Sequence, residues 1–396
     1  MQSREKENLQ SIRCALFLMS IHILYDGMKF LLNLLGFRSF NFILGIYFLC
    51  LLYALNILIK YGIRKRDVIR AGMWYLLYGL AYVLCTNDSQ RMYFTSAEVE
   101  AIFAFYLPIS MLVITRVRDW MVLFQDNVCI LFTDMLITIS FISKLTGVNK
   151  TNYMSFSYHL LPFCCLVFVS AYLFHQKVQW IVTGIGLLAC TVYGARGSLL
   201  WFLLFCTFIY TARTMGGCTE RPAMVKAMIK GAILVAAVIV VIHVFFPILL
   251  HSEFAANSYV LKRIQQGELL HSAGRDRIGR FCRAALSRMS ILDVNSMFYD
   301  RTFLPNNTYA HNIVYEVFLS FGWILGSMFL ICLAVPILNT FVRTDLNGKI
   351  MWLFFMCSFF LRYFISGSIF DEGAFYIFFA GIVSLTNARR SAEIVR

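Results

Sequence analysis

Charged residues are scarce in this 396-residue chain. Asp, Glu, Lys and Arg make up 14% of it, whereas hydrophobic residues make up 60%. A soluble domain carries about 25% charged residues, so this composition, with a mean hydropathy of +0.71, excludes an ordinary soluble globular protein. The sequence predicts an all-α, polytopic membrane protein with a single integral membrane domain over residues 1–396.

Several signatures of soluble enzymes and metalloproteins are also missing. The sequence contains no metal-ligand spacing, no phosphate-binding glycine loop and no stretch with the composition of a soluble domain. We therefore expect no metal, no cofactor and no nucleic-acid partner. No internal repeat is evident, which disfavours a transporter built from inverted repeats without excluding one.

Long apolar runs fill most of the chain. A bilayer core of about 30 Å needs roughly 20 apolar residues per helix, and the clearest such run, Gly231 to Leu250, contains no acid, lysine or arginine. Runs of this kind predict about twelve transmembrane helices, several of them short or carrying a charge. They lie near residues 13–34, 41–59, 69–85, 101–115, 128–143, 154–174, 178–193, 198–212, 231–250, 311–337, 350–365 and 370–386.

Lys and Arg in the short loops predict the orientation. Such residues are retained on the cytoplasmic side, and with the N-terminus inside they gather in the even-numbered loops, as at 60–70, 116–118 and 213–230. The tail then also ends inside, so an even number of spans in the cytoplasmic (inner) membrane is favoured. One large extracytoplasmic loop, residues 251–310 between spans 9 and 10, is expected to carry short helices.

The large loop holds more basic than acidic residues. Apolar residues recur at helical spacing, which predicts a helix lying in the membrane interface with its apolar face in lipid. They are Ile278, Phe281, Cys282, Ala285, Leu286 and Met289. Its arginines, Arg277 among them, either anchor the loop to anionic lipid or grip a specific phosphate of a lipid-linked substrate. Arg275 is the best candidate for the phosphate role because it follows a glycine and opens the helix, although an ordinary helix-start arginine fits the spacing equally well.

A second arginine lies in a turn between two apolar runs, within "GARGSLLW". Arg196 is flanked by glycines, and the predicted topology puts this turn on the same outer face as the large loop. A charge at the membrane boundary is costly unless it is paired or functional. We therefore favour a functional role for Arg196 over that of an arginine that snorkels at a helix end.

The stretch "TYAHNIVYEVFLSFGWILG" places His311 and Asn312 at the start of the tenth apolar run, again on the predicted outer face. A helix N-terminus carries a partial positive charge, which disfavours imidazolium. His311 is therefore expected to be neutral and able to accept a proton. The alternative is an ordinary interfacial histidine.

Three motifs, "GARGSLLW", "SAGRDRI" and "YAHNIVYEVFLSFGWILG", resemble in order and spacing the O-antigen ligase and O-antigen polymerase family of bacterial membrane proteins. The resemblance extends from Thr191 to roughly Phe329, together with the plan of about twelve spans. It implies a metal-independent glycosyltransferase that takes a glycan from undecaprenyl diphosphate on the outer face of the membrane. It also implies that Arg196 and Arg275 bind the diphosphate and that His311 assists the acceptor hydroxyl.

The implied chemistry agrees with these residue types. Fixed guanidiniums stabilise the negative charge that grows on the leaving diphosphate, and a neutral histidine acts as general base for an inverting attack. Asp276, Glu268 and Glu316 are alternative bases, and Glu316 could instead satisfy a buried partner. Arg277 could support the phosphate site, and Asn312 either orients the histidine or binds the acceptor.

Polymerase and ligase share these features. A polymerase transfers a growing chain onto the next lipid-linked repeat, whereas a ligase transfers the finished glycan to a lipid A core or another acceptor. The stretches "TNYMSFSYHLL" and "SGSIF" look more like capsular or exopolysaccharide polymerases, so polymerase is favoured. The partners implied are the undecaprenyl-diphosphate-linked oligosaccharide, membrane lipids, and a chain-length regulator and a flippase of the same pathway. A lipid-linked oligosaccharide transporter (flippase) is the second alternative, but it would place its charges along a path near the membrane midplane.

Overall fold

A computed structural model describes residues 2–37, 42–85, 87–147, 151–216, 229, 274–305 and 308–395. Within these ranges the regular structure is helical and contains no strand, which confirms the predicted all-α class. The longer helices are α1 (Gln2–Leu34), α2 (Ile43–Tyr61), α3 (Lys65–Leu84), α7 (Asn127–Leu145), α8 (Tyr153–Leu173), α9 (Lys177–Tyr193), α10 (Arg196–Gly216), α14 (Arg275–Arg288), α15 (Ile313–Arg343), α16 (Leu346–Phe355) and α17 (Gly373–Val395). The short ones are α4 (Asp88–Phe94), α5 (Ala97–Ala101), η1 (Ile102–Tyr106), α6 (Leu107–Leu112), η2 (Ile114–Arg116), η3 (Trp120–Phe124), η4 (Tyr299–Thr302), η6 (Met356–Phe360) and η7 (Leu361–Phe364).

Six helical segments of the described chain are long and apolar enough to cross a membrane, judged by length and composition. The predicted run Gly231–Leu250 lies outside the described residues, and each of the other eleven predicted runs overlaps a helical segment. The apolar helices at Lys177–Tyr193 and Gly373–Ala388 are shorter. A count of about twelve spans therefore stays a prediction. The six segments are Ser3–Leu34, Ile43–Tyr61, Asp88–Arg116, Asn127–Leu145, Tyr153–Leu173 and Ile313–Arg343.

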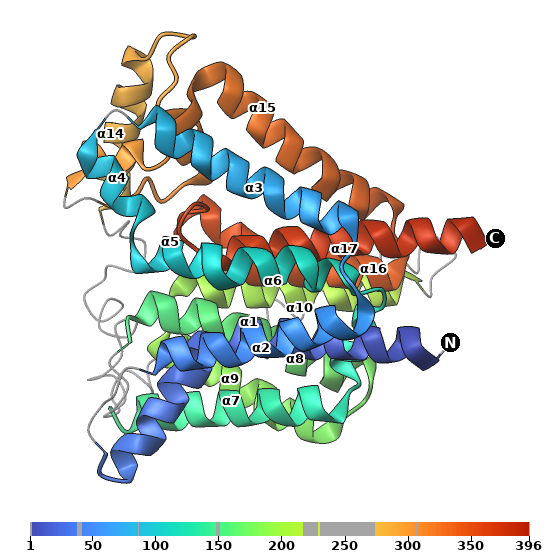
Figure 1. Ribbon diagram of the computed structural model, residues 1–396. Helices are drawn as coiled ribbons and strands as arrows, with labels where there is room; N and C mark the ends of the chain where they lie inside the picture. The colour runs from blue at the N-terminus through green and yellow to red at the C-terminus, as the bar shows by residue number, and fades with distance from the viewer. Residues whose placement is uncertain are drawn as a thin grey trace.

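The two termini lie at the same end of the helix bundle, and α4 and α14 lie at the opposite end (Figure 1). We call these the terminal end and the α14 end. An even number of membrane crossings gives this arrangement, as the loop charges predict. The first turn of α8, which holds Met154, contacts α14 through Arg275 and therefore belongs to the α14 end.

Helix α8 is the most buried of the apolar helices. Its sequence is apolar on all sides rather than along one stripe, which is typical of a helix surrounded by protein. It packs against α1, α7, α9 and α10. Because neighbours enclose it on several sides, the start of α8 is a fixed platform for side chains at the α14 end.

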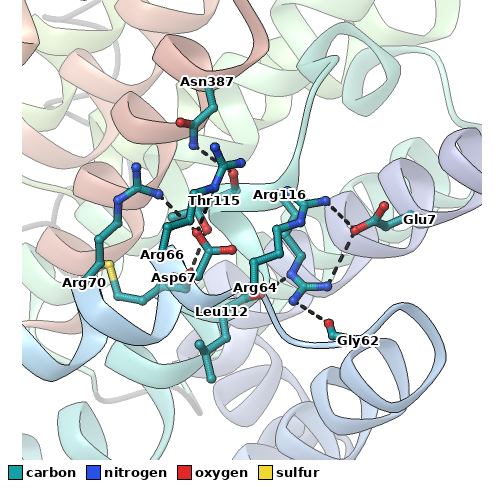
Figure 2. Close-up of polar contacts among 11 residues, drawn as sticks. Glu7, Gly62, Arg64, Arg66, Asp67, Arg70, Leu112, Thr115, Arg116 and Asn387 are labelled. Carbon is teal, nitrogen blue, oxygen red and sulfur yellow. Dashed lines mark hydrogen bonds and ion pairs between the residues drawn. The ribbon is translucent and has the colours of Figure 1, made fainter. Parts of the chain in front are cut away.

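Polar contacts hold three segments together at the terminal end (Figure 2). Arg116 is 1% exposed, and it donates from Nη2 to the carbonyl of Gly62 at 2.6 Å and from Nε to that of Leu112 at 2.5 Å. Glu7 of α1 lies 3.5 Å from Arg116 Nη1 and accepts a hydrogen bond from Arg64 at 2.7 Å. The arginines of the short loops, from which the sequence predicts the orientation, therefore also join α1, the α2–α3 turn and η2.

The regular path of α15 is interrupted at Gly322, which has a φ of +71°. Only glycine adopts a left-handed φ without steric cost, and a Cβ here would overlap the carbonyl oxygen of Asp293. On the same stretch, Asn295 donates to the carbonyl of Leu319 at 3.0 Å. The glycine in "FLSFGWILG" therefore lets the chain that follows α14 pack directly on the backbone of α15.

Candidate functional site

Helix α14 confirms the helix predicted in the large loop, but its surroundings differ from the prediction. Cys282 and Leu286 are buried in a small core with Leu304, Ala310 and Leu319. The chain between α14 and α15 covers these two side chains, whereas Phe281 on the same predicted face is 38% exposed. The prediction that the apolar face lies in lipid is therefore wrong for Cys282 and Leu286, because protein side chains cover them. The part of the loop at 251–273 lies outside the described residues.

A buried carboxylate fixes the segment that leads to His311. Asp300 in η4 is fully buried, and its Oδ2 accepts a hydrogen bond from the backbone N–H of Ala310 at 2.7 Å. Burial raises the pKa of Asp300 to about 6. The bond closes the chain between η4 and α15 and sets the backbone immediately before His311.

His311 has an unusual backbone and a half-buried side chain. Its φ is +54°, in the left-handed region that non-glycine residues rarely adopt. Its ring lies against Tyr309, with 4.1 Å between the ring centroids. Nδ1 is buried and has no hydrogen-bond partner in the described part of the chain. A ring nitrogen is thus left with an unused hydrogen-bonding position.

The imidazole of His311 is neutral at pH 7. Burial, and after it the positive charge of Arg275, lowers the pKa of His311 to about 4. The sequence predicts the same direction from the dipole of the following helix. The physical causes in the structure are instead desolvation and a neighbouring guanidinium. His311 and Arg275, 36 positions apart in the sequence, therefore act on each other electrostatically.

Asn312 has a structural role. Its Oδ1 accepts hydrogen bonds from the backbone N–H groups of Val314 at 2.9 Å and Tyr315 at 3.4 Å, which makes it the N-cap of α15. Its Nδ2 donates to the carbonyl of Phe364 at 3.1 Å. The side chain thus joins the start of α15 to the end of η7, and its two polar atoms are used in these bonds rather than on the ring of His311.

Arg275 is the first residue of α14 and follows Gly274, which has a φ of +85°. Its side chain is half-buried, and Nη2 lies 3.7 Å from the sulfur of Met154 on α8. The same sulfur lies 3.8 Å from Oγ of Ser366. Met154 therefore contacts both the start of α14 and the loop before α17.

The turn that holds Arg196 also contacts the start of α8. The backbone N–H of Ala195 donates to Oγ of Ser157 at 2.9 Å. Gly197 lies so close to the hydroxyl of Tyr158 that a Cβ would overlap it. The Arg196 side chain itself is exposed. The structure thus places the turn of Arg196 and the side chain of Arg275 on the first two turns of the same helix.

The supporting candidates fall into two groups. Asp276 and Arg277 are exposed on α14, and the guanidinium of Arg277 lies 5.7 Å from the ring centroid of Phe281 on its own helix. Glu316 is 2% exposed, accepts a hydrogen bond from Ser368, and accepts another from the backbone N–H of Ile369 at 3.2 Å. Glu316 therefore satisfies buried donors of the loop before α17, the second of its two predicted roles. Glu268 lies outside the described residues.

Two buried ion pairs at this end do not appear among the candidates from the sequence. Arg301 pairs with Asp371, and Arg362 lies 2.7 Å from Oε2 of Glu372. The guanidinium of Arg301 also lies 4.7 Å from the ring centroid of Tyr93. The available signal was the charge of Arg362, Asp371 and Glu372 within an otherwise apolar C-terminal region. Their pairing joins segments too far apart in sequence for spacing to reveal it.

The loop before α17 contacts the His311 segment through Tyr309. The backbone N–H of Gly367 donates to the Tyr309 hydroxyl at 3.2 Å. Gly367 has a φ of +88°, and a Cβ there would lie 2.7 Å from Oε1 of Glu372. Tyr309 therefore links His311 to the loop that leads to Glu372. Met154 links Arg275 to the same loop through Ser366. Arg196 contributes its turn to the same neighbourhood.

Metal ligands are not grouped at this end: the described residues contain no cluster of His, Cys, Asp and Glu able to hold a metal ion. Comparison with models of known protein families, with curated proteins and with solved structures finds no match for this chain. The family resemblance of the three motifs therefore stays a prediction.

Proposed function

We propose that this protein is a polysaccharide repeat-unit polymerase of the cytoplasmic membrane. It transfers a glycan from undecaprenyl diphosphate to a hydroxyl of another lipid-linked repeat unit, and it does so at the α14 end, on the outer face. The apolar helices and the shared end of the two termini support a multi-pass protein with both termini on one side of the membrane.

One observation carries the proposal: a neutral histidine lies under the influence of an arginine at a helix start. His311 has an unpaired Nδ1 within the described structure, and the charge of Arg275 contributes to its low pKa. Transfer from a lipid diphosphate needs a base for the acceptor hydroxyl and a cation for the leaving group. These two residues, with Arg196 at the start of α10, supply both.

In the proposed reaction the acceptor oxygen attacks the anomeric carbon on the face opposite the diphosphate. The bond between that carbon and the diphosphate oxygen breaks, and its electron pair leaves with the diphosphate. The hydroxyl proton passes to the neutral imidazole of His311. Arg275 and Arg196 stabilise the charge on the leaving group, and the anomeric centre is inverted.

Substrate binding makes His311 a better base. In the free protein burial, and after it the positive charge of Arg275, lowers the pKa of His311. A bound diphosphate brings negative charge beside Arg275 and offsets the second of these effects, so the pKa of His311 is higher in the complex than in the free protein. Arg275, which binds the leaving group, therefore also changes the pKa of His311.

The test uses purified protein in lipid vesicles with undecaprenyl-diphosphate repeat units, without nucleotide sugar or added metal. A ladder of chain lengths is the expected product of a polymerase. A single transfer to an added lipid A core, without a ladder, would instead indicate a ligase. Movement of the lipid-linked glycan across the membrane without any new glycosidic bond would indicate a flippase and would contradict transferase chemistry.

A further inference from the structure

A cavity of about 360 Å³ lies inside the bundle next to the candidate site. Its lining comes from α1, α2, α5, η1, α8, η6, η7, the loop before α17 and the start of α17. The lining includes the exposed residue Glu98 of α5, and α5 lies towards the α14 end of the bundle (Figure 1). Its size is at the lower limit of ordinary ligand pockets, about 300–1,000 Å³. It therefore suits a ligand of one or two rings.

One wall of the cavity combines flat rings with hydroxyl groups. His22 of α1 and His159 of α8 are stacked, with 4.4 Å between the ring centroids and 9° between the planes. The Tyr47 hydroxyl lies 3.4 Å from Nε2 of His22 and donates to the Tyr106 hydroxyl at 3.3 Å. The wall therefore offers ring faces for packing and groups that both donate and accept hydrogen bonds.

A charged pair also lines the cavity. Arg362 pairs with Glu372 at 2.7 Å, and its guanidinium lies 4.6 Å from the ring centroid of Tyr158. Nε of Arg362 is buried and has no hydrogen-bond partner within the described residues. The pair thus presents a donor group and an acceptor group side by side, an arrangement that matches the hydroxyls of a sugar ring.

The charge of the lining selects against phosphate. Three carboxylates, Glu98, Asp371 and Glu372, line the cavity in the described structure, and its one guanidinium, that of Arg362, is already paired with Glu372. Asp371 is paired with Arg301. A phosphate would therefore meet no unpaired guanidinium in this lining, whereas a neutral ring with many hydroxyls meets both donors and acceptors. The diphosphate therefore belongs with Arg275 and Arg196, outside this cavity.

We propose that the cavity binds one or two neutral sugar rings at the non-reducing end of the acceptor glycan. This end carries no phosphate, and its hydroxyl is the nucleophile of the polymerase reaction on which the proposal rests. Tyr158 lines the cavity and also contacts the turn of Arg196 through Gly197. The cavity and the turn of Arg196 are thus neighbours that share the side chain of Tyr158.

The test measures binding without turnover. The probe is the lipid-free repeat-unit oligosaccharide, released by mild acid from the lipid-linked pool of the producing cells, and saturation-transfer NMR follows its binding to the full-length protein in nanodiscs. Ala374 lines the cavity. We expect Ala374→Leu, which fills it, to weaken binding by about tenfold, or about 1.4 kcal/mol. Ala374→Ser, which keeps the space, should bind like the wild type.

Equal binding by wild type and Ala374→Leu, or no sugar binding by the wild type, would overturn the proposal. A photo-crosslinking experiment avoids dependence on the variant. A diazirine-bearing copy of the oligosaccharide should label the cavity wall at 155–162 or 371–377 in the wild type. Labelling confined to other segments would also overturn it.

The outcomes separate this proposal from the proposed function. If the wild-type protein binds the oligosaccharide in the cavity but forms no glycosidic bond, the result supports the sugar site and contradicts the polymerase function. If the protein extends chains but Ala374→Leu binds the oligosaccharide normally, the result supports the polymerase function and contradicts the sugar site.

Discussion

His311 is the residue on which the proposed chemistry depends most. Its left-handed φ follows directly after the hydrogen bond between Asp300 and the backbone of Ala310, and Tyr309 packs against its ring. A non-glycine residue held in this region costs about 1–3 kcal/mol. The surrounding contacts therefore hold the imidazole in one orientation instead of letting the backbone relax.

The pH dependence of kcat/KM tests the state of His311. The base acts as neutral imidazole, and burial with the charge of Arg275 lowers its pKa to about 4. We expect kcat/KM to stay constant as the pH falls from 7 to about 5 and to decrease with a midpoint near 4. The midpoint in kcat should be higher, because bound diphosphate offsets Arg275. A midpoint near 6.5 in kcat/KM would contradict the account.

Arg275→Lys tests recognition of the diphosphate. Lysine keeps the charge but cannot make the paired, parallel hydrogen bonds of a guanidinium. The loss of one charged hydrogen bond, about 1.5–3 kcal/mol, should reduce kcat/KM by roughly tenfold to a hundredfold. Arg280→Lys, an exposed arginine on the same helix, is the matched control and should retain activity. Equal activity of the two variants would remove Arg275 from the site.

At the scale of helices, the sequence predicts the elements of the site better than their contacts. The spacing of Ile278, Cys282 and Leu286 correctly predicts α14, and the apolar run after Asn312 correctly predicts α15. An asparagine directly before an apolar run is a common N-cap, so that role was also available from the sequence. The burial of Cys282 and Leu286 on α14 was not available from the sequence, because it depends on the tertiary packing of residues such as Leu304 and Ala310.

Gly322→Ala tests how the chain after α14 docks on α15. Alanine at a φ of +71° and a ψ of −174°, a region that essentially only glycine adopts, costs about 1–3 kcal/mol, and its Cβ would also overlap the carbonyl oxygen of Asp293. We expect the free energy of unfolding in detergent to fall by at least this amount. Gly79→Ala is the control, because nothing lies within 4 Å of the position of its Cβ and φ is ordinary. An equal or higher stability of Gly322→Ala would contradict the packing described.

At the scale of the whole molecule, the two ends of the bundle have different chemistry. The terminal end uses its arginines to join segments, as Arg116 does. The α14 end combines the neutral His311 with Arg275, the turn of Arg196 and two buried ion pairs. Composition and charge predict the membrane class and the shared side of the termini. They do not predict Arg362 with Glu372, since that pairing depends on how η7 folds back before α17.

Arg116→Met tests the structural role of the terminal end. The substitution keeps an apolar stem but removes the charged donor to the carbonyls of Gly62 and Leu112, and a hydrogen bond to a charged group contributes about 1.5–3 kcal/mol. We expect a lower midpoint of thermal unfolding with unchanged kcat/KM in the folded fraction. Arg118→Met, at an exposed neighbouring position, should unfold like the wild type. Indistinguishable unfolding of the two variants would refute this role.

The most direct test of the central claim compares two histidine variants in the vesicle assay with undecaprenyl-diphosphate repeat units. His311 and His175 are both loop histidines with a left-handed backbone, at φ +54° and +56°, so alanine affects the two backbones alike. His175 is exposed and follows the last turn of α8, so it lies away from the candidate site. We predict that wild type and His175→Ala produce the same ladder of chain lengths and that His311→Ala, equally folded, produces none. A wild-type ladder from His311→Ala would contradict the proposed mechanism.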